Sequence, residues 1–67
     1  MEDKELEIIQ KHVEKLGLDM KSTVTMGDLS ALRTSLRSAG EFGMADWAEH
    51  LGGPEDLEDF IVNIIYG

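Results

Sequence analysis

The chain has 67 residues, a formal net charge of −8 and no cysteine. This length suits one domain, and the lack of cysteine excludes disulfides and thiolate metal sites. An apolar content of 42% argues against wholesale disorder, and no apolar run approaches the ~20 residues that span a bilayer. Residues 1–5 are charged and mostly acidic, unlike a signal peptide, so we expect a soluble, cytoplasmic protein.

The first expected helix covers residues 2–16. Its apolar residues recur at the spacing of one helical face, with acids in the first turn and Lys15 in the last. Gly17 is expected to end the helix in the left-handed conformation. Residues 19–25 contain Ser and Thr at positions that favour turns and caps over a helix interior, so they indicate a loop.

The second expected helix covers residues 26–38. Thr25 is followed three residues later by Asp28, a spacing that resembles a capping box. Gly40 is the expected stop. The apolar face of this helix consists of Leu29, Leu32 and Leu36.

The third expected helix covers residues 43–51, and two glycines after it allow a sharp reversal of the chain. Its apolar face consists of Met44, Trp47, Ala48 and Leu51. By residue type Trp47 is suited to interfaces, but its place on this face predicts a core residue.

The fourth expected helix covers residues 54–66. Pro54 fits the first helical position, and four acids follow it near the positive end of the helix dipole. The apolar face consists of Leu57, Phe60, Ile61, Ile64 and Ile65. Residues 60–66 are also rich in strand-forming types, but a strand here would be apolar on both faces and would need a sheet for which partner strands are lacking. We therefore favour the helix.

These elements predict an all-α fold, a compact single domain of four helices joined by short loops. We expect the first three helices to wrap around the fourth, because the fourth has the most apolar face.

Charge is distributed unevenly along the chain. Residues 1–37 contain all six Lys and Arg and seven acids, whereas residues 38–67 contain seven acids and no Lys or Arg. The acidic half repels nucleic-acid phosphates and attracts basic partners, although a solvated surface that keeps a small protein soluble has the same composition.

The sequence therefore predicts a small regulatory or inhibitory module that docks on a basic surface of a protein partner, such as its nucleic-acid site. The expected partner-binding residues are Asp46, Glu49, Glu55, Asp56, Glu58, Asp59 and Tyr66. The main alternative is self-association, in which a homodimer completes a core that 67 residues cannot close alone.

Arg33 and Arg37 lie one turn apart on the second expected helix and form a possible anion-binding pair. The alternative is that they pair with the chain's own acidic half. Residues 26–51 also have the outline of a helix-turn-helix, but the second helix of that pair has no Lys or Arg. Because phosphate contacts dominate affinity for DNA, direct nucleic-acid binding is not expected, and a degenerate DNA-binding regulator is the weakest alternative.

Nothing in the sequence predicts an enzyme, a metal site or a cofactor. Asp46 and His50 are spaced as two ligands on one helix, but no convincing third ligand accompanies them. His12, the other histidine, is interpreted as a solvated residue. No serine lies in a nucleophile motif, and the glycine pairs do not form a phosphate-binding loop.

Overall fold

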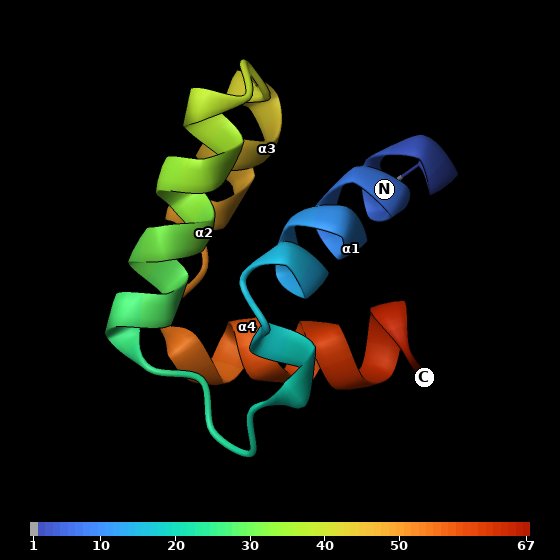
Figure 1. Cartoon of the computed structure of the whole chain (residues 1–67), viewed down its shortest axis with the longest axis vertical. Helices are drawn as coiled ribbons and strands as arrows, with labels where there is room; N and C mark the ends of the chain where they lie inside the picture. The colour runs from blue at the N-terminus through green and yellow to red at the C-terminus, as the bar shows by residue number, and fades with distance from the viewer. Residues whose placement is uncertain (1) are drawn as a thin grey trace.

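The computed structural model describes residues 2–67, and its elements are all helical (Figure 1). In chain order they are α1 (Asp3–Lys15), the 3₁₀ turn η1 (Leu18–Met20), α2 (Met26–Ser38), α3 (Phe42–Glu49), α4 (Pro54–Phe60) and the π-helical turn η2 (Ile61–Ile65). No strand occurs within residues 2–67, so the all-α class is confirmed, and residues 60–65 are helical. No helix in this range is both long enough and apolar enough to cross a membrane.

The helix ends form as the sequence predicts. The Thr25 hydroxyl accepts a hydrogen bond from the Asp28 N–H at 3.2 Å, and the Asp28 carboxylate accepts one from the Thr25 N–H at 2.9 Å. This reciprocal pair is the predicted capping box at the start of α2. Gly17 and Gly40 adopt φ values of 70° and 79°, in the left-handed region, and terminate α1 and α2.

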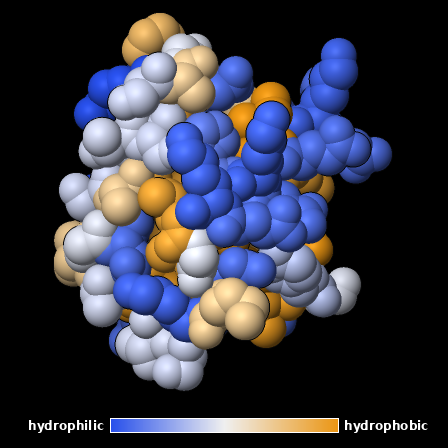
Figure 2. All heavy atoms as spheres, viewed as in Figure 1, coloured by the Kyte–Doolittle hydropathy of each residue, from blue (hydrophilic) through white to orange (hydrophobic). Residues whose placement is uncertain are grey.

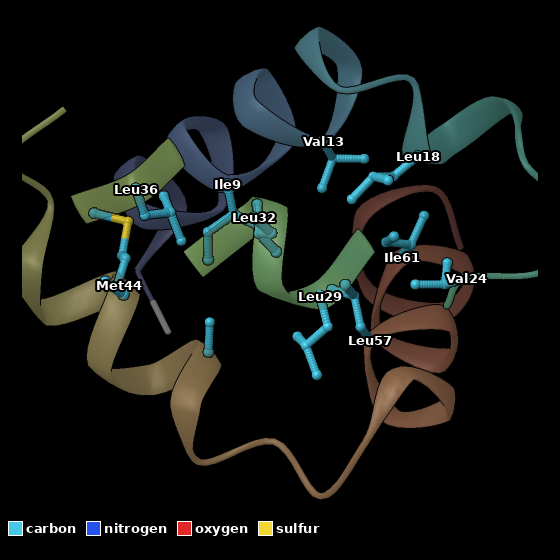
Figure 3. Close-up of a cluster of buried hydrophobic side chains, with 12 residues drawn as sticks. Ile9, Val13, Leu18, Val24, Leu29, Leu32, Leu36, Met44, Leu57 and Ile61 are labelled. Atoms are coloured by element: carbon cyan, nitrogen blue, oxygen red, sulfur yellow. The ribbon is translucent and has the colours of Figure 1, made fainter. Parts of the chain in front are cut away.

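The central element is α2, whereas the sequence analysis placed the fourth helix at the centre. Three of its leucines have no exposed surface, and α2 packs against α1, α3 and α4 (Figure 3). The expectation was wrong because, of the apolar residues in the predicted helix 54–66, only Leu57 and Ile61 are buried, and Ile64 is exposed. The core consists of Ile9, Val13, Leu18, Val24, Leu29, Leu32, Leu36, Met44, Ala45, Ala48, Leu57 and Ile61.

The C-terminal helix changes its winding after Phe60. The Tyr66 N–H donates to the Ile61 carbonyl at 3.1 Å, five residues back, which defines the wider π turn. Ile61 stays buried and Ile65 packs against the core, but Ile64 is 53% exposed. From the sequence we expected one α-helix to residue 66 with Ile64 buried. The wider turn rotates the Ile64 side chain off the buried face.

The other bounds differ by small amounts. Helix α3 begins at Phe42 and ends at Glu49, earlier than the predicted 43–51, and α1 is one residue shorter at each end than 2–16. The loop predicted at residues 19–25 overlaps the turn η1. Leu18, the first residue of this turn, is buried in the core with 2% exposure. Helices α3 and α4 meet through Trp47 and Phe60, whose rings lie 4.7 Å apart, consistent with the expected core position of Trp47.

Candidate functional site

The six carboxylates expected to face a partner divide into two groups. Three of them make contacts within the chain. Glu49 forms an ion pair with Arg37 of α2. Asp56 accepts a hydrogen bond from the Gly52 N–H at 2.8 Å, and Glu58 accepts one from the Val24 N–H at 3.1 Å. These three carboxylates hold loops and helices together, so part of the acidic composition has a structural use.

The other three carboxylates, Asp46 on α3 and Glu55 and Asp59 on α4, are exposed. Within residues 2–67 none of them forms an ion pair with Lys or Arg, because those pairs involve other acids. Glu55 and Asp59 lie one turn apart and line a shallow hollow with Thr23, Val24, Pro54 and Glu58. We call Asp46, Glu55 and Asp59 the acidic surface.

His50 lies beside this surface. Its Nδ1 donates to the Asp46 carbonyl oxygen at 2.7 Å and lies 3.9 Å from the Asp46 carboxylate. The hydrogen bond to this carbonyl, followed by the charge of the Asp46 carboxylate, raises the pKa of His50 above its ordinary value. Protonation of His50 therefore offsets part of the negative charge at Asp46.

The two arginines of α2 both reach α3. The Arg33 Nε donates to the Ala48 carbonyl at 3.1 Å, and one of its terminal nitrogens lies 3.5 Å from the Glu49 carbonyl. These carbonyls belong to the last turn of α3, where a cation complements the helix dipole. With Arg37 on the Glu49 carboxylate, both side chains that were possible anion ligands bind groups of the chain itself.

Tyr66 follows η2, whereas Glu55 and Asp59 of the acidic surface lie on α4, before η2. Its hydroxyl donates to the Glu14 carboxylate of α1 at 3.0 Å, and 47% of the residue is exposed. Partial desolvation, followed by this hydrogen bond, raises the pKa of Tyr66. Tyr66 therefore contacts α1, whereas the acidic surface lies on α3 and α4.

His12 is buried, with 9% exposure, so its interpretation as a solvated residue was wrong. Its Nδ1 lies 2.7 Å from the Ser35 hydroxyl of α2. Spacing on α1 contained the signal, because His12 is three residues after Ile9 and shares its face. Within residues 2–67 no carboxylate hydrogen-bonds to His12, so the pair lacks the third group that orients a catalytic histidine.

In residues 2–67 no three His, Cys, Asp or Glu side chains are grouped so that they could hold a metal ion. Comparison of the chain with protein-family models, curated proteins and solved structures finds no match.

Proposed function

We propose that this chain is a cytoplasmic protein-binding module that regulates or inhibits a partner by docking its acidic C-terminal half on a basic surface. The observation that carries the proposal is the charge of residues 38–67, which hold seven acids and no Lys or Arg. A nucleic-acid site on another protein is a basic surface of this kind, and covering it would inhibit by steric occlusion.

The exposure of Asp46, Glu55 and Asp59 supports this proposal. Within residues 2–67 none of these side chains forms an ion pair with Lys or Arg, and His50 lies beside Asp46 alone. Complementary charge mainly accelerates association and rejects wrong partners, and it is screened by salt over about 8 Å at physiological ionic strength. The module would therefore bind quickly at low salt and lose affinity as salt rises.

The proposal is tested with the triple variant Asp46→Asn, Glu55→Gln and Asp59→Asn. Each substitution removes one negative charge, so the net charge changes from −8 to −5. Glu2→Gln, Glu14→Gln and Asp19→Asn make the same change outside α3 and α4, at exposed positions, and form the matched control. Partners are captured from lysate with each protein, identified, and remeasured as purified pairs.

We expect the acidic-surface variant to lose a basic partner that the wild type and the control variant retain. Melting curves must show that both variants stay folded, because removing Glu55 from the first turn of α4 costs about 0.3–1 kcal/mol of dipole stabilisation. Equal retention of every partner by the two variants would show that the acidic surface does not bind.

Self-association is the second candidate function, and exposed apolar side chains favour it. Phe42, Val62 and Ile64 are 66%, 59% and 53% exposed. Sedimentation equilibrium at two salt concentrations separates the candidates, because a dimer doubles the 7.5 kDa mass of the chain.

A further inference from the structure

A groove runs between α1 and the C-terminal turn η2, on the side of the molecule where both chain ends lie (Figure 1). Its volume is about 290 Å³. Hydrophilic side chains cover α1 in Figure 2, and hydrophobic atoms are visible beside it toward the C-terminal segment. The lining residues are Asp3, Leu6, Glu7, Gln10, Ile64 and Ile65.

The apolar floor of the groove arises from the π turn. In a continuous α-helix Ile64 would follow Leu57 and Ile61 on the buried stripe. The five-residue hydrogen bond to Ile61 displaces Ile64, which then lies half exposed opposite Leu6 of α1. π-Helical turns often occur at functional sites.

The rim of the groove is acidic. Asp3 and Glu7 are one turn apart on α1, and both are exposed. No Lys, Arg or His lines the groove, and neither carboxylate forms an ion pair within residues 2–67. An apolar floor with a rim of one charge is complementary to a helix that carries basic residues beside an apolar stripe.

We propose that this groove binds an amphipathic helix of a partner protein, with its apolar stripe on Leu6, Ile64 and Ile65 and its Lys or Arg side chains on Asp3 and Glu7. A second copy of this chain is a poorer occupant, because two chains of charge −8 repel each other. The site lies on elements other than the acidic surface of α3 and α4, so either proposal can fail alone.

The probe is a fluorescein-labelled synthetic helix of about 14 residues, four turns, with Leu at i, i+3, i+4 and i+7 and Lys beside them. A peptide of the same composition with the leucines scattered is the peptide control. Binding is measured by fluorescence anisotropy, and the site is mapped by amide chemical shifts in NMR spectra.

Two pairs of variants test the floor and the rim. Ile64→Asp should weaken peptide binding about tenfold or more, because it removes the apolar contact of one isoleucine. Val62→Asp is its control, since Val62 is 59% exposed on the same turn but does not line the groove. Glu7→Lys should weaken binding several-fold, whereas Asp19→Lys, with the same charge change on η1 and outside the groove lining, should leave it within about twofold.

On addition of the patterned peptide, we expect the amide chemical shifts of Leu6, Gln10 and Ile64 to change. The proposal is overturned if the patterned peptide binds no better than the scattered one, or if Asp19→Lys weakens binding as much as Glu7→Lys. A concentration-dependent dimer that Ile64→Asp abolishes would also overturn it, because the occupant would then be a second copy. If Ile64→Asp unfolds the chain, the comparison of Glu7→Lys with Asp19→Lys decides.

Discussion

The Nδ1 of His12 lies 2.7 Å from the Ser35 hydroxyl, so a polar contact joins α1 to α2 at the edge of the apolar core. Burial lowers the pKa of His12, and the nearby charge of Lys15 and, more weakly, Lys11 acts in the same direction. The Glu41 carboxylate opposes them. The neutral imidazole is therefore the form that the folded protein accommodates.

This relationship predicts that stability falls as pH decreases below about 6.5, the ordinary pKa of histidine. Below that pH His12 is protonated in the unfolded chain but stays neutral in the folded protein. The loss of stability levels off once the pH is below the pKa of His12 in the folded protein. Urea unfolding between pH 8 and pH 5 measures this dependence.

The variant His12→Gln isolates the contribution of His12 to this profile. It should lose the downward slope below pH 6.5 even though it is less stable overall. The effect of His50 on stability has the opposite sign, because folding raises its pKa. Its stabilising contribution is fully present below pH 6.5 and is lost as pH rises through the pKa of His50 in the folded protein. An unchanged slope in His12→Gln would contradict the assignment.

The contact between Glu58 and the Val24 N–H predicts a stability effect at an acidic position. Glu58→Ala leaves a partly buried N–H without its acceptor, which should cost about 1–3 kcal/mol. Glu58→Gln retains an acceptor oxygen and should cost less. Asp59→Ala, at the exposed neighbouring position, should stay within about 0.5 kcal/mol of wild type in chemical denaturation. Equal effects at Glu58 and Asp59 would show that the contact does not stabilise the fold.

The two arginines of α2 should contribute unequally. Arg33→Ala removes a charged donor from the last carbonyls of α3, at a part-buried position, and should cost about 1.5–3 kcal/mol. Arg37→Ala removes an exposed ion pair with Glu49 and should cost less than about 1 kcal/mol. Thermal unfolding of the two variants gives the comparison, and a larger loss at Arg37 would reverse it.

The helix ends could be predicted from the sequence, because interactions between residues close in the chain determine them. The Thr25–Asp28 capping box and the left-handed glycines at 17 and 40 followed from residue types and spacing. The central position of α2 could not be predicted in this way, because the apolar content of a helix does not determine how many other helices pack against it. The π turn was not predicted either, since the apolar spacing of residues 57–65 fits a continuous α-helix.

The sequence predicted which part of the chain carries the acidic residues, but it did not predict how their side chains are arranged in the fold. Net charge located the acidic half, but only tertiary contacts separate Glu49, Asp56 and Glu58 from the exposed acids. The groove beside Ile64 depends on the π turn and on α1 together, so no single stretch of sequence predicted it.

The most direct test of the acidic-surface proposal is the salt dependence of the association rate with a purified partner. We predict that the rate falls steeply with ionic strength for the wild type and for the control variant Glu2→Gln, Glu14→Gln and Asp19→Asn. For Asp46→Asn, Glu55→Gln and Asp59→Asn it should be slower at low salt and depend on salt only weakly. The same steep dependence in the wild type and in this last variant would contradict the proposal.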